Sequence, residues 1–254
     1  MKNNNDTFFT KGLALLKHFF FPPECVFCEK ILEINTPLLI CDKCKGSLSF
    51  LYERLCCVKC GKPIVSHGKR QLCYFCAEGK SHYFDRIVSV FEYTDDVRDS
   101  IVRYKVLSTE GYSKTYADFL CELFQKSYLS ENFDFICSAP PHTKKANNKG
   151  TDRLNLLCHT LSSKINITFE KEMLVKVRKT QKQTKLSYVE RLTNLNGAIA
   201  AAHPDAVLGK NVLLIDDVCT TRATIMECAR ALKVAGAKRV CAMTIATTVK
   251  NSKE

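Results

Sequence analysis

The chain has 254 residues, of which 46% are hydrophobic and 25% are charged, and these proportions are ordinary for a globular protein. Its formal net charge of +12 favours polyanionic partners. Eight of the 15 cysteines form four Cys-x-x-Cys pairs, and no secretory signal precedes them. This combination argues against a secreted disulfide framework and predicts a cytoplasmic protein that binds metal.

Residues 1–21 form a polar leader followed by an apolar stretch that Lys11 and Lys17 interrupt. The stretch is too short and too charged to span a bilayer, and no small-residue cleavage site follows it. We expect an amphipathic N-terminal arm that packs on the protein's own core, with contact to a membrane surface as the alternative.

Residues 22–81 carry two copies of one cysteine pattern, in which twelve residues separate two Cys-x-x-Cys pairs, and the second copy repeats the first at an offset of 32. Each pair can form a knuckle with both sulfurs pointing inward, and two knuckles complete a tetrahedral four-thiolate site. We therefore expect a double zinc-ribbon module with two structural zinc ions that supply folding energy. A crossed pairing of the knuckles, or the loss of one metal, remains an alternative. The predicted ligands are Cys25, Cys28, Cys41, Cys44, Cys57, Cys60, Cys73 and Cys76.

Residues 82–250 read as a second domain in which strands alternate with helices. The pattern predicts strands over 84–93, 133–137, 173–177, 212–215 and 239–246, and helices over 95–107, 114–128 and from about 224 to 235. Such alternation implies an α/β domain with a mainly parallel sheet flanked by helices.

The strand at 212–215 leads into the most informative segment of the chain. Asp216 and Asp217 follow it, and a threonine-rich loop then enters a helix. A loop at a helix N-terminus presents N–H groups to an anion, and ligands of open α/β sheets bind where strands end. The two carboxylates would repel phosphate, so we expect them to meet sugar hydroxyls or a hydrated Mg²⁺.

Two basic loops follow other predicted strands, one over 138–153 and one over 178–191. Residues 142–191 contain twelve Lys or Arg against four Asp or Glu. We interpret these cations as facing pyrophosphate or a nucleic-acid strand, with an ordinary solvated surface as the alternative. They are Lys144, Lys145, Lys149, Arg153, Arg178, Lys179, Lys182, Lys185 and Arg191.

The order of an apolar strand, two acids, Thr-Thr-x-x-Thr and a helix resembles the ribose-5-phosphate loop of type I phosphoribosyltransferases. With the four cysteine pairs and Arg178-x-Thr180-x-x-Gln183, the chain from Cys25 to Thr247 resembles the ComF family of bacterial competence-associated proteins. The resemblance implies a type I phosphoribosyltransferase-like domain that binds phosphoribosyl pyrophosphate (PRPP) with Mg²⁺. By this resemblance the PRPP-binding residues are Asp216, Asp217, Thr220, Thr221, Arg222, Ala223 and Thr224, with Ser138, Ala139 and Pro140 as the pyrophosphate loop.

Family loops usually carry Gly where this chain has Arg222. Arg222 could reach a phosphate as a bidentate cation, or its bulk could obstruct the site.

The resemblance implies a role in DNA uptake and natural transformation, with single-stranded DNA bound through the basic loops. Other DNA-uptake or recombination proteins are the expected further partners. The alternative is an active phosphoribosyltransferase with an unidentified acceptor, for which Asp216 and Asp217 are the catalytic candidates.

Overall fold

The computed structural model describes residues 22–34, 36–64, 71–78, 82–107, 109–141, 153–178, 180 and 194–249. The chain divides into two compact units, residues 1–48 and residues 49–254. The predicted arm over 1–21 lies outside the described residues. None of the helices in the described part of the chain has the length and apolar character that crossing a bilayer requires.

The described part of the first unit is built around its four cysteines. The Cys25 N–H donates to the Lys30 carbonyl and the Glu29 N–H donates back to the Cys25 carbonyl, which closes the first knuckle. The second knuckle enters the short helix α2, Asp42–Ser47, whose N-cap is the Cys41 sulfur that accepts from the Cys44 N–H. The cysteines of this unit therefore also lie in its turns.

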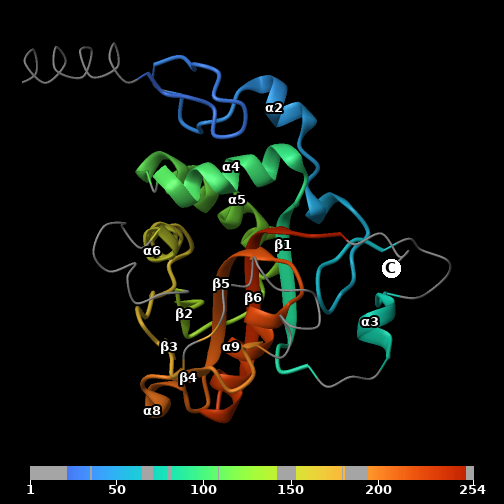
Figure 1. Ribbon diagram of the computed structural model, residues 1–254, viewed down its shortest axis with the longest axis vertical. Coiled ribbons are helices and arrows are strands. Elements are labelled where there is room, and N and C mark those ends of the chain that lie inside the picture. The colour runs from blue at the N-terminus through green and yellow to red at the C-terminus, as the bar shows by residue number, and fades with distance from the viewer. Residues whose placement is uncertain are drawn as a thin grey trace, which may run out of the picture. The chain divides into compact units, whose positions relative to one another are not determined.

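The second unit contains a four-stranded parallel sheet with the order β1-β6-β5-β2 (Figure 1). The strands are rich in aliphatic residues and are buried along most of their length, as expected for a parallel sheet covered on both faces. Their bounds are Arg86–Glu92 for β1, Phe135–Ser138 for β2, Asn211–Cys219 for β5 and Arg239–Thr247 for β6.

Helices cover both faces of this sheet. Helices α5 and α6 pack together on one face, and α9 packs against β5 and β6 on the other. Alternate side chains of β5 pack on opposite faces of the sheet. Val212 and Leu214 join the core beneath α9, while Leu213 and Ile215 point the opposite way. The helices are α4, Asp95–Leu107; α5, Glu110–Ser127; α6, Arg153–Ile165; and α9, Ala223–Val234, with the short elements η1, Leu51–Glu53; α3, Tyr74–Ala77; and α8, Pro204–Val207.

The strand expected at 173–177 forms, but it does not join the parallel sheet. It is β3, Leu174–Lys176, and it pairs antiparallel with β4, Ile199–Ala201, in a separate two-stranded sheet.

The second cysteine group lies within the larger unit. Cys57 and Cys60 belong to the core cluster beneath α9, together with Phe84 and Ile87. Gly61 closes the knuckle with φ of +68°, and a Cβ there would lie 2.6 Å from the Ile87 carbonyl oxygen. The second ribbon is therefore seated directly on β1. The domain limits at 22–81 and 82–250 stay a prediction.

Candidate functional site

Strand β5 continues through the two carboxylates instead of ending before them. Its pairing with β6 extends to Cys219 and Thr247, so the diacid lies within the last part of the strand. Successive residues of a strand point to opposite faces. Asp216 and Asp217 consequently face different layers of the molecule, which the sequence alone did not indicate.

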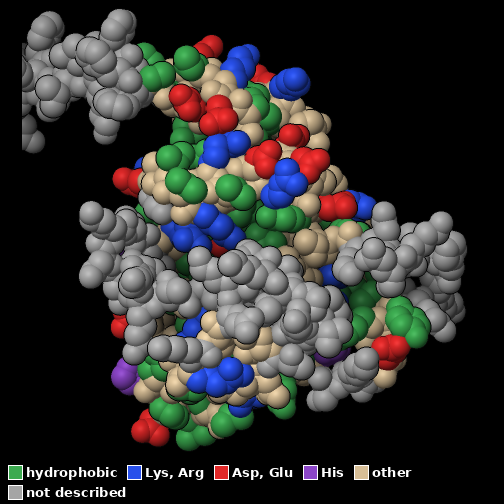
Figure 2. Space-filling view, viewed as in Figure 1, with side chains coloured by type: hydrophobic (Ala, Val, Ile, Leu, Met, Phe, Trp, Pro, Cys, Tyr) green, Lys and Arg blue, Asp and Glu red, His purple; other side chains and the backbone are tan. Residues whose placement is uncertain are grey.

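Asp217 forms ion pairs with cations from two helices. Its Oδ2 lies 2.9 Å from Lys105 Nζ at the end of α4 and 3.6 Å from Arg153 Nη2 at the start of α6. Lys and Arg side chains gather between α4 and α6 on the face shown in Figure 2. Arg153 is thus the one predicted basic-loop residue that the described structure brings to the diacid.

Asp216 is held in a different environment. Its Oδ1 accepts from the N–H of Asp217 at 2.9 Å. Burial, followed by the neighbouring carboxylate of Asp217, raises the pKa of Asp216 to about 7, against the opposing effect of Lys105 and Arg153. Lys176 of β3 contributes an attractive charge, and its own pKa is lowered by burial. A carboxyl group that titrates near neutral pH in a partly closed site is a candidate ligand-binding group.

The loop after β5 forms one side of a small open pocket, and some of its polar groups already form hydrogen bonds within the protein. Thr221 is buried, and its hydroxyl accepts from the Ala223 N–H at 3.3 Å. The Thr220 carbonyl accepts from Lys62 Nζ and from the Thr248 hydroxyl. The pocket is lined by Asp216, Val218, Cys219, Thr220, Arg222, Ala223, Thr224 and Ile225.

Arg222, which lines this pocket, also makes contacts that the sequence did not suggest. Its backbone takes the left-handed conformation that the usual Gly would supply, with φ of +67° and ψ of 0°. Its side chain is buried against the second ribbon, with the guanidinium carbon 3.9 Å from the centre of the Phe75 ring and Nη1 3.6 Å from Cys60 Sγ.

The turn predicted as the pyrophosphate loop lies beside the diacid. Strand β2 pairs with β5 so that Ser138 is opposite Ile215, and the Ala139 N–H donates to the Ile215 carbonyl. The Ser138 hydroxyl donates to Asn155 Oδ1 of α6 at 2.9 Å. Because parallel strands end at one edge, this turn, which continues to Pro140, and the threonine loop border the same region.

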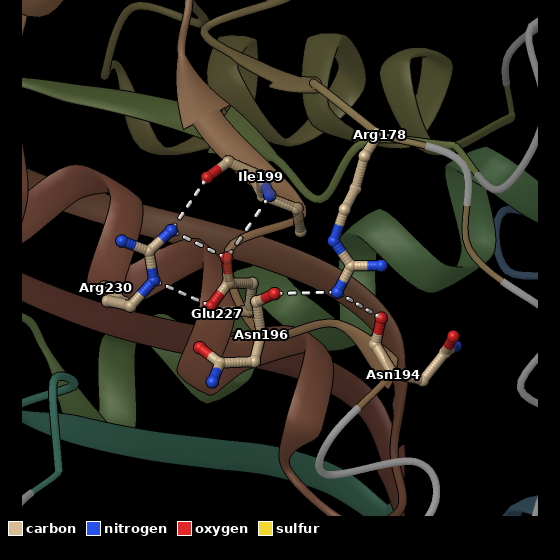
Figure 3. A network of polar contacts seen from close by, with 6 residues as sticks. All are labelled: Arg178, Asn194, Asn196, Ile199, Glu227 and Arg230. Atoms are coloured by element: carbon tan, nitrogen blue, oxygen red, sulfur yellow. Dashed lines mark hydrogen bonds and ion pairs between the residues drawn. The ribbon is translucent and has the colours of Figure 1, made fainter.

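Arg178 holds together the two ends of the second basic segment. Its Nη2 donates to the backbone carbonyls of Asn194 and Asn196, at 3.0 and 2.7 Å (Figure 3). Nearby, the buried Glu227 of α9 accepts from the Ile199 N–H and forms an ion pair with Arg230. These bonds anchor the small sheet to α9. The contacts described for Arg178 are therefore structural.

Both cysteine groups fit a zinc ion. The ligating sulfurs of each group lie within 4.8 Å of one another, and the groups pair each Cys-x-x-Cys with the next one along the chain, not in a crossed arrangement. Cys28 Sγ to Cys41 Sγ and Cys60 Sγ to Cys73 Sγ are both 3.6 Å, close to the ~3.8 Å that tetrahedral Zn–S bonds require.

Several predicted basic residues lie outside the described residues: Lys144, Lys145, Lys149, Lys179, Lys182, Lys185 and Arg191. Conversely, sequence reasoning missed Lys62, Lys105, Lys176 and Phe75. Each lies far along the chain from the residue that it meets, and although Phe75 and Lys62 lie within or beside a cysteine pair, that pattern does not point to these contacts. Only the last-turn position of Lys105 in its helix offered a local signal.

The chain is similar to known proteins along most of its length. Residues 16–77 match the family model described as a double zinc ribbon domain. The DNA utilization protein YhgH of Salmonella typhimurium is 27% identical over 86% of this chain and 94% of its own length. Competence protein ComFC of Bacillus subtilis is 24% identical over 76% of this chain and 77% of its own. Competence protein F of Haemophilus influenzae is 25% identical over 87% and 95%.

Among solved structures, adenine phosphoribosyltransferase from Leishmania donovani aligns over 59% of this chain and 74% of that chain, with 11% identity and a TM-score of 0.36. A likeness of this size supports no inference about a ligand or an activity. This chain is therefore similar to a double zinc ribbon domain over residues 16–77, and to competence and DNA utilization proteins over most of its length.

Proposed function

We propose that this chain acts in DNA uptake during natural transformation and binds PRPP with Mg²⁺ at the segment 216–224. Relatives named as competence and DNA utilization proteins support the first part, because they match the chain over most of its length. The observation that carries the second part is the convergence of a diacid, a threonine loop and the turn at Ser138 on one edge of a parallel sheet.

In this proposal the parts of the site have separate roles. The hydroxyls of Thr220 and Thr224 and the first N–H groups of α9 bind the ribose 5-phosphate. Asp216 and Asp217 bind ribose hydroxyls or a hydrated Mg²⁺, whose preferred ligands are oxygens. Ionised Asp216 is needed for either partner, so affinity rises as pH increases through about 7.

In this proposal the cations beside Asp217 bind the pyrophosphate group. Lys105 and Arg153 lie within 4 Å of that carboxylate, whose chain neighbours Asp216 and Val218 line the pocket. A pyrophosphate group would receive charge-assisted hydrogen bonds from them in exchange for the carboxylate. The turn from Ser138 to Pro140 would supply backbone N–H donors at this end.

Single-stranded DNA is the second proposed ligand, bound through the basic segments around 142–153 and 178–191. The support is the excess of twelve cations over four acids in residues 142–191, within a chain of net charge +12. Binding to phosphates releases counterions, so affinity should fall steeply with salt.

Calorimetric titration of the zinc-loaded protein with PRPP and MgCl₂ tests the pocket. We expect the Asp216→Asn/Asp217→Asn double variant to abolish binding. Asp95→Asn/Asp96→Asn removes the same charge from another diacid, at the start of α4, and should leave binding intact. Retained binding in the first variant, or no binding by the wild type, contradicts the assignment.

Fluorescence anisotropy with a labelled oligothymidine tests the DNA part. We expect binding whose affinity falls about tenfold or more between 50 and 200 mM salt. An affinity that does not depend on salt, or the absence of binding at 50 mM, would show that the basic segments do not contact DNA phosphates.

A further inference from the structure

Arg222 joins the loop at the end of β5 to the second cysteine group. Its guanidinium lies between the Phe75 ring, 3.9 Å from the ring centre, and Cys60 Sγ, 3.6 Å from Nη1. Phe75 belongs to α3, between the ligands Cys73 and Cys76. One side chain from the loop therefore touches both knuckles of the second site.

The ring contact continues through a longer stack. His82 lies parallel to Phe75 with ring centres 5.4 Å apart, and Phe84 lies parallel to His82 at 5.0 Å. Lys59 Nζ is 5.6 Å from the centre of the Phe84 ring at the far end. Burial lowers the pKa of His82, which favours the neutral ring between its two neighbours. A cation thus stands at each end of a column of three rings.

A second contact runs from the same ribbon to the loop backbone. Lys62 Nζ donates to the Thr220 carbonyl at 3.4 Å. Lys62 follows Gly61, whose close approach to Ile87 fixes the turn on β1. The loop is consequently held at Thr220 by its backbone and at Arg222 by its side chain.

The backbone of Arg222 explains why these contacts matter. A non-glycine residue at φ of +67° is strained, and such strain persists only where the surroundings hold it. The Phe75 ring and the Cys60 sulfur contact the Arg222 side chain, and the Met226 N–H donates to its carbonyl at 2.8 Å. Contacts of the Arg222 side chain thus hold a backbone conformation that Gly would adopt without strain.

We propose that the second cysteine site, Cys57, Cys60, Cys73 and Cys76, is a structural support of the loop 220–224, and that Arg222 is the positioning residue through which zinc binding sets the conformation of this loop. A zinc ion with four thiolates carries a net charge of −2, which Arg222 and Lys62 offset. Without the metal the two knuckles separate, and Arg222 loses both surfaces that hold it. The inference goes beyond the proposed function, because it needs no ligand in the pocket.

Hydrogen exchange of the peptide spanning 218–228, measured without PRPP, tests the link. Cys73→Ser/Cys76→Ser removes two ligands from the second site, and Cys41→Ser/Cys44→Ser removes the equivalent pair from the first site. Each variant should lose one zinc ion per chain by elemental analysis. We expect exchange in the loop to rise about fivefold or more in the first variant and to stay unchanged in the second.

Arg222→Gly separates the side chain from the backbone, because Gly accepts φ of +67° without strain. It should retain both zinc ions and the protection of β6, while loop exchange again rises about fivefold. Phe75→Leu should give the same rise, and adding it to Arg222→Gly should produce no further increase.

Equal loop exchange in the two cysteine variants would overturn the proposal, and so would wild-type loop exchange in Arg222→Gly. These hydrogen-exchange rates and zinc contents do not depend on whether the protein binds PRPP. The test of the support and the test of the pocket can therefore fail independently.

Discussion

Asp216→Asn is expected to stabilise the ligand-free protein, although the carboxylate is a proposed binding group. Burial raises the pKa of Asp216 from its ordinary value of 3.8 to about 7. The folded protein therefore binds this proton more tightly than the unfolded chain does. Stability attributable to the group is complete below pH 3.8 and falls as pH rises to about 7.

The size of the effect follows from the same values. At about 1.4 kcal/mol per pKa unit, the difference between 3.8 and about 7 gives a ceiling of roughly 4 kcal/mol at pH 8. About half of it is present at pH 5.5. We expect a measured gain of about 1–2 kcal/mol at pH 8, because the Asn amide must also be buried. Its oxygen can still accept from the Asp217 N–H.

Urea unfolding of the zinc-loaded protein at pH 5.5 and pH 8 checks this prediction. Asp134→Asn is the matched control, because the pKa of Asp134 is lowered by the Asn211 N–H and by Lys210. That variant should lose stability by the same amount at both pH values, since both lie well above the pKa of Asp134. A loss of stability in Asp216→Asn at pH 8, or a gain of equal size at both pH values, would refute the reasoning.

Three further outcomes are expected. Chelation of zinc should open the first unit to proteolysis before residue 49, while the parallel sheet keeps its far-UV circular dichroism, because this unit buries few apolar side chains of its own. Gly61→Ala should lower stability in urea by at least about 2 kcal/mol more than Gly197→Ala, since both have φ of +68° but only the first places a Cβ 2.6 Å from the Ile87 carbonyl oxygen. Glu227→Ala should lower the free energy of unfolding by about 3 kcal/mol, because it leaves a buried strand N–H and a cation without this acceptor. Glu122 belongs to an exposed ion pair, so Glu122→Ala should lower it by less than about 1 kcal/mol. Equal losses in the two variants would contradict the assigned burial.

Features with a local cause could be read from the sequence. The spacing within each cysteine copy is set by knuckle geometry, and both predicted groups of four are confirmed. Helix α4 begins and ends at the predicted residues, and the mainly parallel sheet flanked by helices is confirmed. The start of the strand before Asp216 was predicted to within one residue, at Val212 where β5 begins at Asn211, because its aliphatic run is continuous.

The end of β5 was not readable, because a neighbouring strand decides it. Pairing with β6 carries β5 through both carboxylates to Cys219. The same strand geometry sends Asp216 and Asp217 to opposite faces: Asp216 lines the pocket at the start of α9, and Asp217 pairs with Lys105 of α4 and Arg153 of α6. A motif of two adjacent acids gives no sign of this division, since both residues are identical in type.

Sequence by itself determined the two zinc sites, the α/β class and the place of the threonine loop, because each depends on residue types at short, regular spacing. Only the tertiary structure decided what Arg222 does. Its partners, Phe75 and Cys60, precede it by well over a hundred residues, and nothing in local propensity links them. The arginine that stands where family loops usually carry Gly contacts the second ribbon, because packing brings an aromatic ring and a sulfur to the residue of loop 220–224 that has positive φ.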